Sequence, residues 1–448
     1  MQPRSERWFL IRARRSTVRR ELVAGLATFL SVCYIFVVSP SILSASGIEP
    51  QAAFFATAVA ATLATLAMGL WANLPFAVAP GLTMSSYFSF VVVQQMGFTW
   101  QQALATVFVS GILCFLLTAL PVRRQLIASI PLGLKQAIAT MVGVFVAAIG
   151  LLLANIIVPG DPLISLNPSA LAPAENPLLW VFLTGLLISV ALGNARLNLP
   201  GGTILAVVAA TFIFWSWSGA EAGAPPAAGS PLSAVGELDF SIFSGVAFLV
   251  PVLVFFVLDF FEGVGEFIGL TAHTSIQDPK GNVPHMEKGL YVDGIATTAG
   301  SLLGTSSLII FVESAVGIKA GGRTGLTALT CAGLMAIVAV LGFFFSSVLL
   351  LVPAAAASGV LVYVGFLLLQ SSVAGIRDAG LTAFDLVVSL IMGTAALLTF
   401  SLDIPLAFGF WAYFLARMIH PVGGRLPALW LGIIALLLTY VSLYEFIG

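Results

Sequence analysis

Five acidic residues lie inside or beside long apolar stretches in the second half of the chain. They are Asp259, Glu262, Glu266, Asp293 and Glu313. Acids in such surroundings are rare and usually functional, because a carboxylate removed from water must bind a proton or find a partner. Protonation of such a group changes its affinity for a polar ligand, and the carboxylate accepts hydrogen bonds from two adjacent N–H groups of a planar ring. The acids therefore predict a buried site for protons and a polar ligand.

Three of these acids recur at helical spacing in LDFFEGVGEFIGL (258–270). A helix places Asp259, Glu262 and Glu266 on one face, and the segment contains no basic residue that could neutralise them. We expect Glu262 to be functional, and Glu313 with it. For Asp259 and Glu266, a hydrogen bond to a neighbouring helix is an equal alternative. Asp293 is expected to cap or pair at the end of its helix.

The composition indicates what surrounds these acids. Of the 448 residues, 59% are hydrophobic and 8% are charged, whereas soluble domains are roughly 45–50% apolar and about 25% charged. The chain cannot cover a water-facing surface, which excludes a soluble enzyme, a disordered protein and a nucleic-acid binder. Three cysteines (Cys33, Cys114 and Cys331) lie in apolar runs without a CxxC pair, so we expect buried thiols. We predict an all-α polytopic membrane protein.

A helix needs about 20 apolar residues to cross a bilayer. Fifteen apolar runs in the sequence have this length or nearly this length. The first is too long for a cleaved signal peptide and lacks a cleavage site. We predict that the first fourteen are spans, and that the last is either a fifteenth span or an interfacial hairpin. The runs are 21–44, 50–71, 74–93, 101–121, 131–157, 177–193, 198–217, 242–270, 288–304, 305–319, 323–345, 351–371, 383–400, 404–419 and 426–446.

The basic residues predict the orientation, since Lys and Arg concentrate in cytoplasmic loops. Seven of the 18 lie in the first 20 residues. If that segment is cytoplasmic, each of the others follows an even-numbered span and lies on the same side. We expect an integral protein of the plasma membrane (bacterial inner membrane) with a cytoplasmic N-terminus. We interpret the basic segment as a topology anchor; a nucleic-acid-binding or lipid-binding arm is the alternative.

The chain divides near residue 225, in a Gly/Pro/Ala-rich outer loop (219–231). Seven spans on each side would make an inverted repeat, the architecture of many secondary transporters. The third span, 73–90, is broken by Pro75 and Pro80–Gly81, and the tenth, 304–317, is short and polar at its start. Broken backbone at membrane depth requires protein or a water-filled cavity around it. We therefore predict a site between these two spans.

A common offset supports the pairing of the halves. Glu313 lies 228 positions after Ser85, and Glu262 lies 228 positions after Tyr34. The three histidines have no metal-ligand spacing, and the sequence has no GxxxxGK[ST], nucleophile elbow or HExxH motif. We expect no cofactor, no metal, no ATP-driven step and no enzymatic activity.

Four segments carry a family resemblance: GLATFLSVCYIFVVSPSILSASG (25–47), APGLTMSSYF (79–88), FFEGVGEFIG (260–269) and GTSSLIIFVESAVGIKAGGRTGLTA (304–328). The chain resembles the nucleobase cation symporters, in the azaguanine-type branch of hypoxanthine, guanine and adenine permeases. The resemblance implies a fourteen-span, seven-plus-seven inverted repeat with short β-strands inside spans three and ten. It also implies a core domain that holds the substrate and a gate domain that scaffolds it and forms a homodimer.

The expected segments follow from that division. They are a basic cytoplasmic N-terminus (1–20), core spans 1–4 (21–121), gate spans 5–7 (122–217), an outer loop (218–241), core spans 8–11 (242–345), and gate spans 12–14 with a C-terminal hydrophobic segment (346–448).

By position, the resemblance implies that Glu262 and Glu313 bind the base. Relatives usually have Asp at the position of Glu262. They also have a GLNAYF sequence where this chain has TMSSYF (83–88), so that Ser85 replaces the asparagine whose side-chain amide would contact the base. A longer acid and a shorter donor could compensate for each other or alter the substrate.

Further substrate contacts are expected from Ser306, Thr83 and three aromatic residues. Phe261, Phe311 and Tyr87 are candidates for stacking on the base, with packing or lipid contact as the alternative. We expect Glu262, Asp259 or Glu266 to couple the proton.

The sequence thus predicts a proton-coupled importer that works by alternating access. Its expected substrate is a nucleobase of the purine class. Its partners would be the nucleobase, the proton and membrane lipid, with no nucleic acid. The alternatives are a carrier of xanthine, uracil or another planar heterocycle, and an anion transporter of the same architecture.

Overall fold

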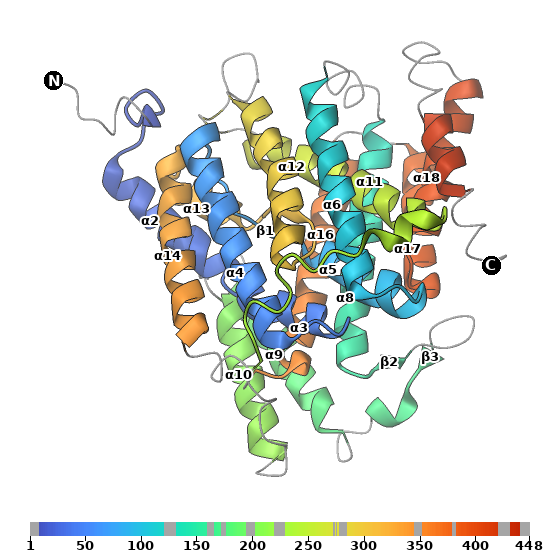
Figure 1. The fold of residues 1–448 in the computed structure, drawn as a ribbon, viewed down its shortest axis with the longest axis horizontal. Coiled ribbons are helices and arrows are strands. Elements are labelled where there is room, and N and C mark those ends of the chain that lie inside the picture. The colour runs from blue at the N-terminus through green and yellow to red at the C-terminus, as the bar shows by residue number, and fades with distance from the viewer. Residues whose placement is uncertain are drawn as a thin grey trace.

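The computed structural model describes residues 9–120, 131–158, 165–171, 176–193, 202–218, 229–271, 274, 276, 285–344, 352–378, 382–419 and 431–439. Helices dominate these residues (Figure 1). The α-helices are α2 (Val18–Val32), α3 (Ile35–Ser44), α4 (Pro50–Ala67), α5 (Leu82–Ser86), α6 (Trp100–Ala119), α8 (Leu132–Leu153), α9 (Pro177–Gly193), α10 (Gly202–Ser218), α11 (Leu249–Thr271), α12 (Met286–Leu303), α13 (Ser314–Lys319), α14 (Gly325–Phe344), α16 (Ser358–Asp378), α17 (Ala383–Thr399) and α18 (Asp403–Ile419).

Two pairs of short strands accompany the helices. The pairs are β1 (Val78–Pro80) with β4 (Leu308–Ile310), and β2 (Ile157–Val158) with β3 (Ser165–Leu166), both antiparallel. Two π-helical segments, Met68–Ala72 and Tyr87–Gln95, continue α4 and α5. The strands β1 and β4 lie inside the third and tenth apolar runs, where the resemblance implied them.

Ten helical segments of the described residues are apolar. Five are long enough to cross a membrane, by length and composition: Val18–Ser44, Pro50–Ala72, Trp100–Ala119, Leu132–Leu153 and Gly325–Phe344. Five shorter ones are Pro177–Gly193, Gly202–Trp217, Leu249–Phe260, Ala355–Gln370 and Ala383–Thr399. The number of spans stays a prediction. Of the final apolar run, 426–446, residues 431–439 are helical and the others lie outside the described residues.

Several apolar runs do not coincide with single α-helices, and each difference has a local cause. The run 21–44 lies in one candidate span, Val18–Ser44, but a turn at Cys33–Tyr34 divides it into α2 and α3. The run 242–270 becomes an α-helix only at Leu249, after a 3₁₀ turn over Phe240–Ser244 that Asp239 caps. The run 131–157 ends as a helix at Leu153, and its last residue begins β2. Apolar composition marks a segment that avoids water but not the point at which its helix stops.

The helices pack in two sets. In the first, α14 contacts α2 and α4, α12 contacts α4 and α6, α11 contacts α6, and α13 contacts α2. In the second, α8 contacts α16, α17 and α18, and α9 contacts α10 and α16. The sets meet where α5 and α11 contact α8 and where α2 contacts α10. Each set draws on both halves of the chain, so the halves are interleaved in space (Figure 1).

A polar network joins the starts of α2 and α14. The buried carboxylate of Glu21 accepts hydrogen bonds from the backbone N–H groups of Arg323 and Thr324 and from the hydroxyl of Thr327. These two N–H groups belong to the residues directly before α14, and Thr327 lies in its first turn. On the same side, the backbone N–H of Gly325 donates to Asn73 Oδ1 at 2.8 Å. The GGRTGLTA segment is therefore a helix start anchored to α2 and to the end of α4.

The crossing of α8 and α16 depends on glycine. A Cβ at Gly365 would lie 2.5 Å from the carbonyl oxygen of Gly143 and 2.8 Å from the backbone nitrogen of Ala147. We predict that Gly365→Ala separates the two helices and destabilises the protein by about 1–3 kcal/mol through overpacking. Thermal unfolding of the purified protein in detergent measures this. The matched control is Gly333→Ala in α14, where a Cβ would meet nothing within 4 Å. Equal melting temperatures for the two variants would contradict the prediction.

Candidate substrate-binding site

The two interrupted spans meet through their backbones. In the register of β1 and β4, Val78 pairs with Ile310 and Pro80 with Leu308. Flanking hydrogen bonds extend the ladder, from Gly81 N–H to Ser307 C=O at 3.0 Å and from Phe311 N–H to Ala77 C=O at 2.9 Å. Each broken segment thus satisfies the polar backbone of the other, which is what an interruption at membrane depth requires.

A threonine covers the outer edge of each strand. Thr65 of α4 donates to the carbonyl of Val78 at 3.0 Å and accepts from the N–H of Val78 at 2.9 Å. Thr297 of α12 makes the same pair of bonds with Leu308, at 3.1 and 3.2 Å. One hydroxyl therefore replaces the missing third strand at each edge. The sequence analysis missed both residues; the available signal was a threonine in the helix preceding each broken segment.

Buried serines link the segments around the strand pair. Ser85 and Ser306, both predicted site residues, lie 2.7 Å apart at their hydroxyl oxygens. Ser39 of α3 lies 3.2 Å from Ser85, and Ser314 accepts from the N–H of Ala77 at 3.0 Å. Thr83 is buried on α5, two residues before Ser85, and within the described residues no hydrogen bond joins it to these serines. The first and third apolar runs are thereby fixed to the tenth.

Glu313 has a partner that the sequence analysis did not assign to the site. Tyr34, 1% exposed at the turn between α2 and α3, donates its hydroxyl to Glu313 Oε1 at 2.6 Å. Hydrogen bonds from a hydroxyl to a carboxylate are short and strong, so this contact orients the acid. The common 228-residue offset had marked Tyr34 as a position equivalent to Glu262, which was the available signal.

The carboxylate of Glu262 has the opposite environment. Both of its oxygens are buried, and within the described part of the chain neither has a hydrogen-bond partner. On the same helix, α11, Glu262 interacts electrostatically with Asp259. An ionised carboxylate in this position is costly unless a proton or a ligand donor reaches it.

The structure brings all five predicted acids together. Glu266 interacts electrostatically with the other four, which lie on α11, on α12 and at the start of α13. Asp293 lies against α11, since a Cβ at Gly263 would be 2.7 Å from its Oδ2. Asp293 lies in the interior of α12, so it does not cap the end of that helix; the alternative, that it pairs there, stays a prediction.

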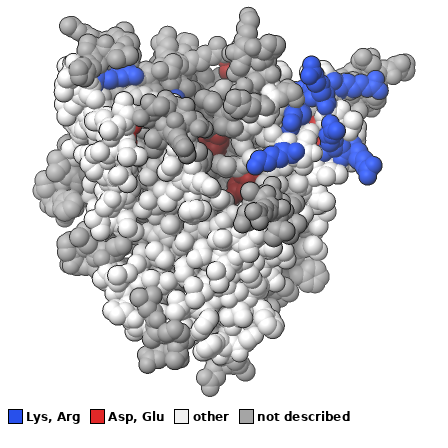
Figure 2. All heavy atoms as spheres, turned by 180° about the vertical axis from the view of Figure 1, so that it is seen from behind, with Lys and Arg blue, Asp and Glu red and all other residues white. Residues whose placement is uncertain are grey.

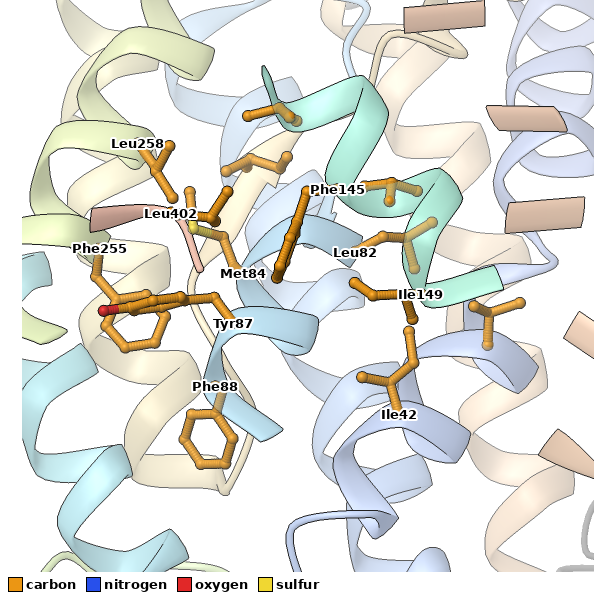
Figure 3. Close-up of a cluster of buried hydrophobic side chains, with 14 of the residues drawn as sticks. Ile42, Leu82, Met84, Tyr87, Phe88, Phe145, Ile149, Phe255, Leu258 and Leu402 are labelled. Carbon is orange, nitrogen blue, oxygen red and sulfur yellow. The ribbon is translucent and has the colours of Figure 1, made fainter. Parts of the chain in front are cut away.

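Two of the three predicted aromatic residues, Tyr87 and Phe311, have described side chains. The ring of Tyr87 packs edge-on against Phe255 of α11, with centroids 5.1 Å apart, as Figure 3 shows. This placement favours packing for Tyr87. Phe311, 4% exposed, follows β4 directly and joins the strand ladder through its N–H. The side chain of Phe261 lies outside the described residues.

A hydrophobic cluster joins α5, which follows β1, to α8 and α11. Figure 3 shows Met84 and Leu82 of α5 facing Phe145 and Ile149 of α8, with Leu258 of α11 nearby. Met84 and Phe145 are fully buried. The residues next to Ser85 therefore contact the second set of helices directly.

Comparison with known proteins identifies the family. The model of a family described as the Permease family matches residues 19–404. The chain belongs to this permease family. The family contains nucleobase/ascorbate transporters, so the protein is an integral membrane transporter and not an enzyme.

Two relatives illustrate the similarity. The adenine permease AdeP of Escherichia coli is 34% identical over 414 residues, which cover 91% of this chain and 89% of the relative. The guanine/hypoxanthine permease PbuO of Bacillus subtilis is 33% identical, and the match covers 92% of this chain and 96% of the relative.

Solved structures show the same fold at low identity. The transmembrane domain of the cyanobacterial bicarbonate transporter BicA has a TM-score of 0.64 and 15% identity, and the match covers 87% of this chain and 97% of that domain. The structure of SLC26A9 has a TM-score of 0.62 and 12% identity, covering 93% of this chain and 68% of that one. The permease chain therefore shares the architecture of these transporters.

The threonine bonds predict a specific loss of stability. Thr65→Val and Thr297→Val each leave a buried N–H and a buried C=O without their partner, and we expect each variant to lose about 1–3 kcal/mol. Thermal unfolding in detergent measures the loss. Thr62→Val is the control, since within the described residues the Thr62 hydroxyl bonds to Ala58 of its own helix and to no strand. A control that loses as much stability would contradict the role of the strand edges.

The Tyr34 hydroxyl predicts an energetic coupling to Glu313. In a double-mutant cycle on thermal stability, Tyr34→Phe and Glu313→Gln should be coupled by about 1.5–3 kcal/mol, the range for hydrogen bonds to charged groups. In the control cycle, Tyr291→Phe takes the place of Tyr34→Phe. The ring of Tyr291 stacks on Trp71, so this variant removes a tyrosine hydroxyl at another place. Strict additivity of the Tyr34 and Glu313 effects would show that the bond does not orient the acid.

Proposed function

We propose that the protein imports a purine nucleobase by proton symport and alternating access. The observation that carries this proposal is the carboxylate of Glu262, whose two buried oxygens have no hydrogen-bond partner among the described residues. It lies in a chain whose relatives include proteins named adenine permease and guanine/hypoxanthine permease.

Glu262 suits the edge of a nucleobase. A carboxylate has two coplanar acceptor oxygens, which match two adjacent N–H donors of a planar heterocycle. A purine that presents such an edge would supply the donors that the protein does not. Binding would then relieve the cost of a buried acid, and this gain would be specific for a ligand with paired donors.

Glu313 would hold the other side of the base. Tyr34 engages Oε1, and Oε2 would accept a hydrogen bond from the base. Strand β4 contacts α11, which carries Glu262, and Glu313 follows β4 at the start of α13. Ser85 and Ser306 bond to each other and would set the position of the backbone amides near the base. Thr83, Phe261 and Tyr87 remain secondary candidates for contacts.

The acid cluster would couple transport to protons. Glu266 interacts electrostatically with the other four carboxyl groups, and these groups cannot all be ionised without strong repulsion, so the cluster would hold protons. Asp259, Glu262 and Glu266 share one face of α11, which allows a proton on one of them to change the charge that the substrate meets. We assign proton coupling to these three residues.

Alternating access would move a core domain against a gate domain. We assign spans 1–4 and 8–11 (21–121 and 242–345) to the core and the remaining spans (122–217 and 346–448) to a gate that forms a homodimer. The two packing sets of helices, and the matching roles of Thr65 and Thr297, support this division and a fourteen-span inverted repeat. We place the N-terminus in the cytoplasm and the protein in the bacterial inner membrane, from the distribution of basic residues.

A carrier of xanthine, uracil or another planar heterocycle is the second candidate, because Glu262 would accept their paired N–H groups equally well. Anion transport is favoured by the fold neighbours only, one of which is a bicarbonate transporter. Five acids around the strand pair oppose an anionic substrate.

The decisive experiment is binding of a nucleobase panel to the purified protein. We expect adenine, guanine or hypoxanthine to bind. Glu262→Gln should weaken binding at least 100-fold and Glu313→Gln at least tenfold, since they affect two and one charged hydrogen bonds to the base, worth about 1.5–3 kcal/mol apiece. Glu287→Gln, at an exposed position on α12, is the control. If the folded protein binds bicarbonate or another anion and no base, the proposal is wrong.

Proton coupling is tested separately in proteoliposomes. With an inward proton gradient, uptake of the bound base should exceed its equilibrium level and should collapse when a protonophore is added. Glu266→Gln should uncouple uptake from the gradient while base binding persists. Uphill uptake that is unaffected by the protonophore would exclude proton symport.

A further inference from the structure

The segment that leads into α2 is fixed to the protein instead of extending from it. Residues 9–16 form a compact turn through backbone bonds such as Ser16 N–H to Ile11 C=O at 2.9 Å. Arg14 is buried and donates to the carbonyls of Asn73 and Arg323 at 2.7 and 2.8 Å. The amide of Asn73 in turn donates to the carbonyl of Phe9 at 3.2 Å. The backbone that carries the basic residues of this segment is therefore held in place by hydrogen bonds.

Helix α2 has two chemically distinct faces. Glu21, Ala24, Gly25 and Thr28 are buried against α13 and α14. Leu22, Val23 and Leu26 are 45%, 53% and 45% exposed. In an integral membrane protein such an exposed apolar face contacts lipid chains.

The exposed apolar face ends in basic residues. Arg19 precedes Leu22, Val23 and Leu26 by three, four and seven positions, so it lies on the same side of the helix. Its guanidinium therefore meets the membrane where the hydrocarbon gives way to head groups. Arg15 and Arg20 are exposed beside it.

A second segment, at the end of α13, adds basic residues next to Arg20. The side chain of Arg20 lies over the loop after α13, since a Cβ at Gly321 would be 2.7 Å from Arg20 Cδ. Lys319, at the end of α13, is exposed, and Arg20 interacts electrostatically with Arg323. Figure 2 shows Lys and Arg side chains gathered at one corner of the molecule.

The acid next to Arg20 in the chain does not neutralise these basic residues. Glu21 is fully buried, and its carboxylate is occupied by the residues at the start of α14. Like charges held close together on a rigid surface repel one another, and a bound anion relieves that repulsion. Guanidinium groups bind phosphate oxygens with two parallel hydrogen bonds, and a phosphodiester at head-group depth has the matching charge.

We infer that Arg15, Arg19, Arg20 and Lys319 form a binding surface for the head group of an anionic phospholipid. The acyl chains of this lipid lie along Leu22, Val23 and Leu26, so the ligand is a membrane lipid and not a soluble phosphate. This inference is independent of the transported substrate.

Lipid binding to the purified full-length protein tests the inference. Phosphatidylglycerol and phosphatidylcholine with identical acyl chains are titrated in a nonionic detergent, and bound lipid is counted by native mass spectrometry. Phosphatidylglycerol should bind more tightly. The triple variant Arg15→Gln/Arg19→Gln/Arg20→Gln should weaken this binding by about fivefold for each charge removed, which corresponds to about 1 kcal/mol per basic residue. Phosphatidylcholine binding should be unchanged.

Matched single variants control for net charge and folding. Arg19→Gln should weaken phosphatidylglycerol binding, Arg19→Lys should retain most of it, and Lys288→Gln, at an exposed residue of α12, should have no effect. The single variants decide the result if the triple variant does not fold. Equal affinity for the two lipids, or an equal loss in Lys288→Gln, would overturn the inference. Competition by millimolar glycerol phosphate would overturn it too, because it would indicate a soluble anion site.

Discussion

The polar backbone of two interrupted spans is the constraint on which the rest of the structure depends. Lipid offers no hydrogen bonds, so the N–H and C=O groups of β1 and β4 must be satisfied by protein. They pair with each other, and Thr65 and Thr297 bond to their outer edges. This arrangement requires the two halves of the chain to meet at one place. It explains why helices from both halves are interleaved instead of forming two separate bundles.

The same junction places the acids. Glu313 follows β4 directly and is oriented by Tyr34, whereas Glu262 on α11 has two buried oxygens without hydrogen-bond partners among the described residues. Two carboxylates with such different surroundings suit different tasks, since one is already satisfied by the protein and the other needs a donor. The proposal of a nucleobase site with proton coupling rests on this contrast.

Helix α2 connects the site to the membrane surface. One face holds Glu21 against the start of α14 and thereby fixes the loop that follows α13, the helix that begins after Glu313. The other face is apolar and ends at Arg19. A single helix thus takes part in the support of the acid and in the contact with lipid, and the proposed phospholipid would bind to the set of helices that carries the site.

The sequence by itself determined that the chain is a helical membrane protein with broken segments at 73–90 and 304–317 and acids beside them. Those features follow from local composition, which is unaffected by the neighbours in space. Only the tertiary structure decided that Tyr34 bonds to Glu313, that Thr65 and Thr297 complete the strands, and that Asp293 packs against α11. Such contacts join residues that are distant along the chain, and an offset of 228 positions suggests equivalence but specifies no hydrogen bond. Helix ends, such as the turn at Cys33–Tyr34, likewise depend on packing, because apolar residues continue through them.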